Sequence, residues 1–133
     1  MIGMRRFIGV AEAVIALRPN AQYAVRDNDY DTMEWFSPDI TIPSKQEVEA
    51  KIAELEADEP MRVVRTIRDY YLRESDWTQM ADVRAHRSQA WRDAWDAYTQ
   101  ELRDITTVAQ PTFDENGVVQ NVNWPTQPSQ TDI

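Results

Sequence analysis

Alternating acidic residues in the first third of the chain are the first group whose types and spacing could do chemistry. Asp27, Asp29 and Asp31 in "DNDYD" have the spacing of the carboxylates that begin a calcium-binding loop. Such a loop requires glycine at its sixth position and a bidentate glutamate at its twelfth, where this chain has Thr32 and Pro38. Asp and Asn side chains also bond to nearby backbone amides in turns. The pattern therefore favours a hairpin turn over a metal site.

The residues that nucleophilic, thiol or phosphate chemistry needs are scarce in this sequence. There is no cysteine, so disulfides, thiolate zinc sites and thiol catalysis are excluded. His86 is the only histidine and lies in the polar, helix-like stretch "VRAHRSQ", where we expect an ordinary solvated side chain. The three glycines form no phosphate-binding loop, and no spacing of carboxylates identifies the cleft that a glycosidase needs. We therefore predict a protein that is not an enzyme and has no cofactor.

Composition limits the classes of partner. The chain has 133 residues, with 23 acidic and 14 basic side chains and a formal net charge of −9. A surface of this sign repels nucleic-acid phosphates and anionic lipids, and no apolar run approaches the roughly 20 residues of a membrane-spanning helix. We expect neither nucleic acid nor a membrane as a partner. The five tryptophans are enough to organise one small core.

Residues 1–43 are predicted to form a β-rich segment followed by a linker. The apolar run "EAVIALRP", closed by Pro19, is interpreted as the first strand. A hairpin is expected around the polar cluster at residues 27–29, because apolar residues stand on both sides of it. Pro38 and Pro43 then mark a linker that ends the segment.

Residues 44–108 are predicted to be helical. Ser44 and Glu47 form an S-x-x-E capping box, in which each side chain satisfies a backbone amide at the start of a helix. A polar break that ends in Pro60 is expected to stop this first helix and to begin a second, because proline is tolerated in a first turn. The second helix is expected to run to about Glu74.

A third helix is expected between residues 83 and 105, where the periodicity of the chain is clearest. Its large side chains recur at spacings of four and three residues: Trp91, Trp95, Tyr98, Leu102 and Ile105. Such a stripe could stack sugars or bases, but at helical spacing it is more typical of a core. We therefore expect this helix to pack antiparallel to the second, with Trp91, Trp95 and Tyr98 as structural anchors.

The polar break "RESDWTQM" places Trp77 between the second and third helices. A catalytic loop, a ligand-stacking platform, a partner anchor and a peg that fixes two helices would all use a tryptophan in this position. We interpret Trp77 as a structural anchor that locks the crossing of the two helices. Asp76 is a second anchor, expected to accept hydrogen bonds from amides of the turn, and Asp82 is expected to cap the third helix.

Residues 109–133 are predicted to be an extended C-terminal segment. Asn116-Gly117 signals a tight turn and a small hairpin. Trp124 follows in "NVNWPTQP", where the prolines favour an extended chain. This tryptophan either folds back onto the helices or engages another chain. The candidate partner contact consists of Val119, Val122, Trp124 and Pro125.

Three blocks stand out together, in the order "IRDYYLRESDWTQMADV" (residues 67–83), "AWDAYTQELRDIT" (94–106) and "VNWPTQP" (122–128). This arrangement resembles the tail assembly chaperone family of tailed bacteriophages. The residues that match the family pattern are Arg68, Asp69, Leu72, Ser75, Asp76, Trp77, Thr78, Gln79, Trp95, Tyr98, Gln100, Leu102, Arg103, Asp104, Ile105, Trp124, Pro125 and Pro128. Thr99 replaces the family's usual arginine, so an ion pair made by that arginine is not expected here.

The resemblance implies a small viral protein that binds tail-fibre or other tail subunits non-covalently and promotes their folding or assembly. It implies no catalysis and no cofactor, and it places the protein in the cytoplasm of the infected bacterial host. The alternative is a structural virion component, retained at the tail fibre or baseplate as a fibre-tip cap or adhesin. A homo-oligomer is compatible with both functions.

The fold class predicted from these elements is α+β. An N-terminal β-hairpin or small sheet is followed by three helices and an extended C-terminal segment. The corresponding regions are residues 1–43, 44–108 and 109–133.

Overall fold

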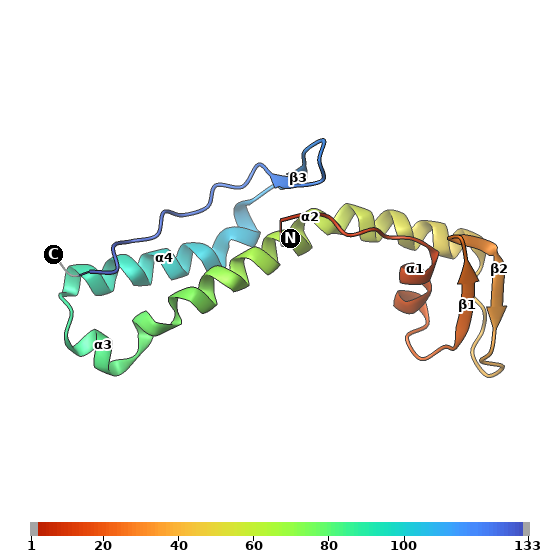
Figure 1. The fold of residues 1–133 in the computed structure, drawn as a ribbon, viewed down its shortest axis with the longest axis horizontal. Coiled ribbons are helices and arrows are strands. Elements are labelled where there is room, and N and C mark those ends of the chain that lie inside the picture. The colour runs from red at the N-terminus through yellow and green to blue at the C-terminus, as the bar shows by residue number, and fades with distance from the viewer. Residues whose placement is uncertain (1–2, 132–133) are drawn as a thin grey trace. The chain divides into compact units, whose positions relative to one another are not determined.

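The computed structural model describes residues 3–131, and the chain divides into two compact units (Figure 1). The N-terminal unit is Arg6–Glu59, and the C-terminal unit is formed by the described residues of Met1–Arg5 and Pro60–Ile133. A β-hairpin and helices make up the first unit, whereas helices, a small sheet and an extended segment make up the second. The fold is therefore α+β, as the sequence predicts.

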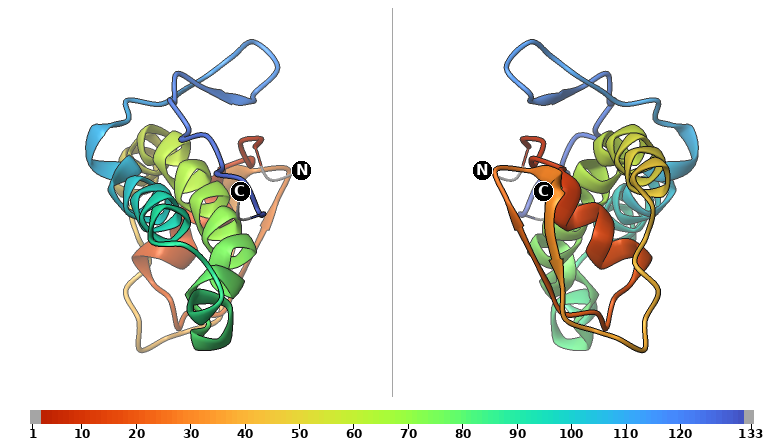
Figure 2. Two further views of the ribbon diagram at one scale, coloured as in Figure 1. Left: turned by 90° about the vertical axis from the view of Figure 1, so that its left-hand side faces the viewer. Right: turned by 90° about the vertical axis from the view of Figure 1, so that its right-hand side faces the viewer.

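The N-terminal unit surrounds one small core. Helix α1 (Val10–Leu17) packs against the antiparallel hairpin of β1 (Tyr23–Arg26) and β2 (Asp29–Trp35), and the first turns of α2 (Lys45–Ser75) pack on both (Figure 2). The buried side chains of this core are Val10, Ala13, Val14 and Val48. Partly buried side chains complete it: Leu17, Tyr23, Val25, Tyr30, Met33, Trp35 and Ile52.

The strand predicted for residues 12–19 is wrong, because this run forms helix α1. A short apolar run is compatible with either a strand or a buried helix, and the hydrogen bonds at its start favour the helix. The N–H of Gly9 donates to the Glu12 carboxylate at 2.7 Å, and the N–H of Val10 donates to Oδ1 of Asn28 at 2.7 Å. Amides at a helix start need such partners. A Cβ atom at Gly9 would collide with the Asn28 amide.

The hairpin predicted at the polar cluster is confirmed. Asp27 and Asn28 form its turn, and both have a φ of 55°, in the left-handed region that two-residue hairpin turns favour. The carboxylate of Asp29 accepts a hydrogen bond from the N–H of Asp31 at 3.0 Å. Within residues 3–131, no group of three or more Asp, Glu and His side chains is arranged to hold a metal ion.

Helix α2 is one continuous helix, so its predicted division at Pro60 is wrong. Its predicted start is confirmed, since Oγ of Ser44 accepts a hydrogen bond from the N–H of Glu47 at 3.1 Å. Proline within a helix removes a hydrogen bond and costs roughly 3 kcal/mol. Val63 and Val64, in the turn after the proline, are completely buried. Burial of these side chains helps to offset that penalty.

In the C-terminal unit, α2 is followed by the helical segments η1 (Asp76–Gln79), α3 (Ala81–Ala85) and α4 (Gln89–Val108). The second half of α2 and α4 run antiparallel, as predicted (Figure 1). The third helix expected between residues 83 and 105 corresponds to α4, and the separate short helix α3 precedes it. Asp82 lies inside α3, and Ser88 is the N-cap of α4, with its Oγ accepting from the N–H of Trp91 at 3.1 Å.

The C-terminal hairpin predicted at Asn116-Gly117 is confirmed by the pairing of β3 (Thr112–Phe113) with β4 (Val119–Gln120). Gly117 has a φ of +75°, a conformation that glycine adopts without strain. The described N-terminal residues pair beside this hairpin. The N–H of Arg5 donates to the Gly117 carbonyl at 2.8 Å, and the N–H of Val119 donates to the carbonyl of residue 3 at 2.8 Å. Residues 3–5 therefore belong to the C-terminal unit.

Candidate functional site

The aromatic stripe predicted on the third helix lies on the buried face of α4. Trp91, Trp95 and Tyr98 are only 6, 0 and 7% exposed. Their neighbouring ring centroids lie 6.0 Å apart for the two tryptophans and 5.5 Å apart for Trp95 and Tyr98, with the second pair edge to face. Burial raises the pKa of the Tyr98 hydroxyl. With Leu102 and the side chains packed on them (Tyr71, Leu72, Trp77, Val83 and Trp124), these residues form the aromatic cluster.

Trp77 lies in η1, at the end of α2, and is half-buried in the aromatic cluster. Its ring centroid is 5.7 Å from that of Trp91 and 5.8 Å from that of Trp95. The turn around it is held by a buried hydroxyl, because Oγ1 of Thr78 donates to the Ser75 carbonyl at 2.7 Å. Trp77 thus joins the end of α2 to the first turns of α4.

Asp76 does not form the amide hydrogen bonds that we expected of it. Its side chain is exposed, and its carboxylate makes no hydrogen bond among the residues that the structure describes. A different carboxylate ties this region to α4. Asp96 accepts two hydrogen bonds of 3.0 Å from the Arg84 guanidinium and one of 3.4 Å from the Gln79 amide. The hydrogen bonds from Arg84 lower the pKa of Asp96 below its usual value.

The C-terminal segment folds back along the helices of its own unit (Figure 1). The Trp124 ring packs edge-on against Tyr71, with centroids 5.3 Å apart and planes inclined by 80°. Further along the segment, the carbonyl of Ser129 accepts a hydrogen bond of 3.0 Å from the Trp95 indole N–H. The sequence left open whether Trp124 folds back onto the helices or engages another chain. In this structure it packs on the helices of its own chain.

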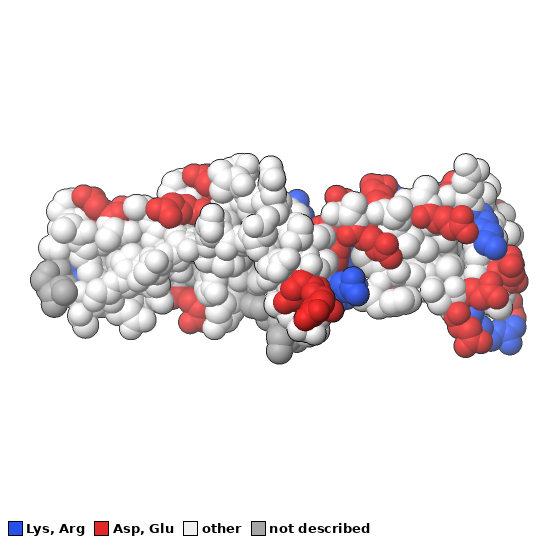
Figure 3. Space-filling view, turned by 90° about the horizontal axis from the view of Figure 1, so that it is seen from above, with Lys and Arg blue, Asp and Glu red and all other residues white. Residues whose placement is uncertain are grey.

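The residues of the candidate partner contact are held in place but not covered. Val119 lies in β4, whereas Val122, Trp124 and Pro125 lie in the extended segment, and all four are half-buried. The sequence from residue 116 to residue 131 contains no charged side chain. The space-filling view shows a largely uncharged surface over this part of the C-terminal unit (Figure 3). The segment thus presents apolar and uncharged polar groups to solvent.

A small open pocket lies where the end of the segment meets the start of α4. Its volume is about 190 Å³, and its lining includes Trp91, Ala94 and Pro128. The buried indole N–H of Trp91 has no hydrogen-bond acceptor among residues 3–131. The Arg87 guanidinium lies 5.2 Å from the centroid of the same indole ring, within the range of a cation–π contact. The arrangement offers an aromatic ring, a cation and an indole N–H donor for non-covalent contacts.

The C-terminal unit also carries the similarity to known proteins. Residues 61–129, more than half of the chain, match the family model described as phage tail assembly chaperone protein. The chain belongs to this family. Comparison with curated proteins and with solved structures finds no match. The matched region contains the aromatic cluster with Trp77 and residues 109–129 of the C-terminal segment, whereas Arg6–Glu59 lies outside the match.

No helix of this family member, within residues 3–131, combines the length and the apolar character that crossing a membrane requires.

The contacts that fix the site could not be predicted from the sequence. Arg84 and Asp96 lie 12 positions apart, and Trp95 and Ser129 lie 34 apart. The sequence indicated only that a tryptophan in the core would need a hydrogen-bond acceptor, because a buried indole N–H generally finds one.

Proposed function

We propose that this family member binds a tail-fibre or other tail subunit non-covalently and promotes its folding or assembly in the cytoplasm of the infected host. The family match over residues 61–129 carries the proposal. The charge of the chain supports it, because a net charge of −9 keeps a protein soluble while it holds an aggregation-prone subunit. The site offers binding surface rather than catalytic groups, which agrees with a helper that acts without an enzymatic step.

The C-terminal segment is the proposed contact with the tail subunit. Trp124 is half-buried, so part of a large amphipathic ring remains available to a partner. Packing against Tyr71 fixes that ring before binding, and Pro125 restricts the adjoining backbone. Both effects reduce the conformational entropy that is lost when the partner docks. Val119 and Val122 extend the contact with further half-buried apolar surface.

Co-expression with the tail-fibre subunit tests this proposal directly. The wild-type chain should increase the soluble, correctly assembled fraction of the subunit and should co-purify with it. Trp124→Ala should weaken capture, whereas Phe36→Ala, which removes a 54% exposed aromatic ring in the N-terminal unit, should not. Equal capture by Trp124→Ala and the wild-type chain would show that the contact lies elsewhere. Capture that requires a dimer in size-exclusion chromatography would point to a homo-oligomer as the active form.

Purified virions distinguish a chaperone from a structural component. A chaperone leaves the tail after assembly, so particles should contain at most traces of this protein. A fixed stoichiometric amount in washed particles would instead indicate a fibre-tip cap or adhesin. Quantitative mass spectrometry of virions, normalised to the fibre subunit, gives this answer.

A further inference from the structure

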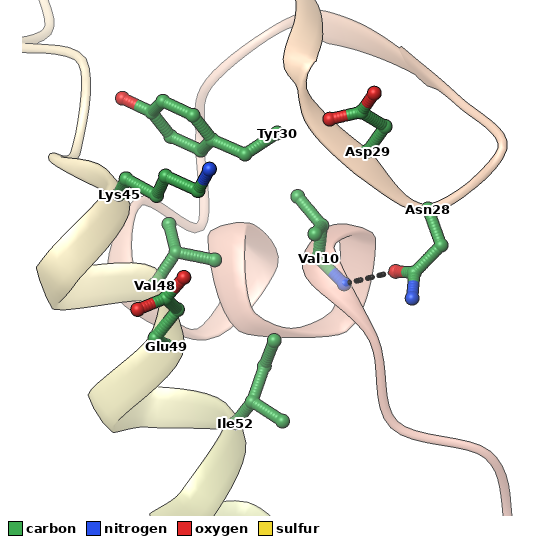
Figure 4. Close-up of a pocket in the computed structure, with 8 residues that line it drawn as sticks. All are labelled: Val10, Asn28, Asp29, Tyr30, Lys45, Val48, Glu49 and Ile52. Atoms are coloured by element: carbon green, nitrogen blue, oxygen red, sulfur yellow. Dashed lines mark hydrogen bonds between the residues drawn. The ribbon is translucent and has the colours of Figure 1, made fainter.

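The N-terminal unit contains a second concave site, which lies outside the matched family region and is independent of the contact proposed above. A pocket of about 300 Å³ opens between α1, the hairpin turn and the first turns of α2. Figure 4 shows Val48, Glu49 and Ile52 on α2 facing Val10 of α1, with Asn28 and Asp29 contributed by the hairpin. The volume is at the lower end for ligand pockets, and it suits one large side chain rather than a cofactor.

The floor of this pocket is apolar and buried. Val48 is 1% exposed and Val10 is 6% exposed, and both belong to the core of the unit. Ile52 is half-buried and extends the apolar surface along α2. The Tyr30 hydroxyl donates a hydrogen bond of 2.6 Å to the Pro43 carbonyl, which fixes that wall. An aliphatic or aromatic side chain would therefore enter a preformed apolar site.

The rim of the pocket is acidic. The carboxylate of Glu49 makes no hydrogen bond or ion pair with any residue among 3–131, and its side chain is exposed. Asp29 stands on the opposite side of the pocket, in the hairpin. Lys45 also lines the pocket, but its ammonium lies 3.7 Å from the Asp31 carboxylate, which offsets its charge. The groups left to attract a partner are carboxylates.

The charge of the whole unit agrees with this rim. Residues 6–59 contain twelve acidic and five basic side chains, so most of the net negative charge of the chain lies in this unit. Acidic side chains outnumber basic ones on the part of its surface seen in Figure 3. Two copies of the unit would repel each other, whereas a basic partner would be attracted.

We propose that this pocket binds a partner protein through one apolar anchor side chain flanked by lysine or arginine. The anchor contacts Val10, Val48 and Ile52, and its basic neighbours contact the carboxylates of Asp29 and Glu49. Apolar burial supplies affinity, and the acidic rim selects the sequence around the anchor. The site gives the N-terminal unit a binding role of its own.

Nuclear magnetic resonance of the full ¹⁵N-labelled chain tests this site with short synthetic peptides. The peptide Lys-Lys-Phe-Lys-Lys should shift the amide signals of the lining residues, mainly those of residues 28–30 and 45–52. Replacing its Phe by Ala should weaken binding about tenfold, because the apolar anchor is lost. The peptide Glu-Glu-Phe-Glu-Glu should not bind, because the rim repels it.

A matched pair of variants locates the charge contact. Glu49→Lys should weaken binding of the basic Phe peptide about threefold or more, whereas Glu56→Lys makes the same charge change away from the pocket and should have a smaller effect. Circular dichroism should show that both variants are folded. Equal affinities for the Phe and Ala peptides, or equal effects of the two substitutions, would overturn the proposal. Concentration-dependent shifts of the lining residues without peptide would also overturn it, because the occupant would then be a second copy.

Discussion

The indole N–H of Trp95 donates a hydrogen bond of 3.0 Å to the carbonyl of Ser129, so the fully buried centre of α4 is tied to the C-terminal segment. An indole donor without an acceptor in a buried site would lose the free energy of its hydrogen bond with water. The segment is therefore part of the structure that stabilises the helix pair, as well as the proposed partner contact.

Truncation after Asn121 should destabilise the protein while leaving the C-terminal hairpin in the chain. Loss of the Trp124 contact with Tyr71 and of the Trp95 hydrogen bond should lower the free energy of unfolding by about 2–4 kcal/mol. Urea denaturation monitored by tryptophan fluorescence measures this change. Trp124→Ala should account for a large share of it. A truncated chain that melts like the full chain would show that the segment makes no net contribution to stability.

Trp77→Ala should destabilise the helix pair by about 3 kcal/mol, near the lower end for large aromatic truncations, because Trp77 is half-buried. The lost contacts are those with Trp91 and Trp95. Trp77→Phe retains a ring and should lose less. Denaturant midpoints of the three proteins give the comparison. If Trp77→Ala is as stable as the wild-type chain but no longer captures the tail subunit, Trp77 is a contact residue and not a structural anchor.

Pro60→Ala should stabilise the chain by about 1–2 kcal/mol. The substitution restores a helix amide and removes a steric clash, and the greater flexibility of the unfolded chain offsets part of this gain. Pro19→Ala is the control, because Pro19 lies in an exposed turn outside any helix and should bring no such gain. Thermal and urea denaturation of both variants should show an increase for Pro60→Ala alone. Destabilisation by Pro60→Ala would mean that packing contacts of the proline ring stabilise the folded chain by more than the restored helix hydrogen bond does.

The Arg84–Asp96 pair should make a small, pH-dependent contribution to stability. The folded-state pKa of Asp96 is lowered, so the contribution is present above the unfolded-state pKa and is lost as the pH falls through the lower folded-state value. Because 48% of the Asp96 side chain is exposed, we expect only about 0.5–1 kcal/mol. The stability difference between the wild-type chain and Asp96→Asn should therefore shrink between neutral pH and pH values below about 4.

Two measurements check this pair. Urea denaturation at several pH values gives the stability difference, and carbon-detected titration of the Asp96 carboxyl gives its pKa. Arg84→Gln should raise that pKa toward the usual aspartate value, since the main cause of the shift is removed. An Asp96 pKa that does not respond to Arg84→Gln would contradict the assignment.

His86→Ala should leave both the melting temperature and subunit assembly unchanged. The side chain is exposed at the end of α3 and is the only histidine of the chain. The co-expression assay with the fibre subunit measures the effect. Lost assembly at an unchanged melting temperature would indicate a functional role for the imidazole and reopen the question of catalysis.

Features set by short-range chemistry could be predicted from the sequence. The turns at Asp27-Asn28 and Asn116-Gly117 depend on residues that tolerate a positive φ, and the cap at Ser44 depends on residues three apart. The antiparallel helix pair follows from the helical spacing of its large side chains. Each of these signals lies within a few residues of the structure it determines.

Features set by long-range contacts could not be predicted in this way. Asn28 provides an acceptor at the start of α1 from 18 positions away, whereas the local pattern of this apolar run predicts a strand. The local pattern around Pro60 predicts the start of a new helix, whereas in the structure α2 continues through it and Val63 and Val64 are buried in the following turn. The partners of Asp96 and Trp95 likewise become neighbours only after folding.

The pairing of residues 3–5 with residues 117–119 has a consequence for synthesis on the ribosome. An isolated bridge between Met4 and Val118 joins two segments, and the second segment is made more than 100 residues after the first. At about 5–20 residues per second, the wait is roughly 6–20 s. The bridge can therefore form only after residues 117–119 have been made, and a ribosome that stops before Gly117 releases a chain in which residues 3–5 lack this pairing.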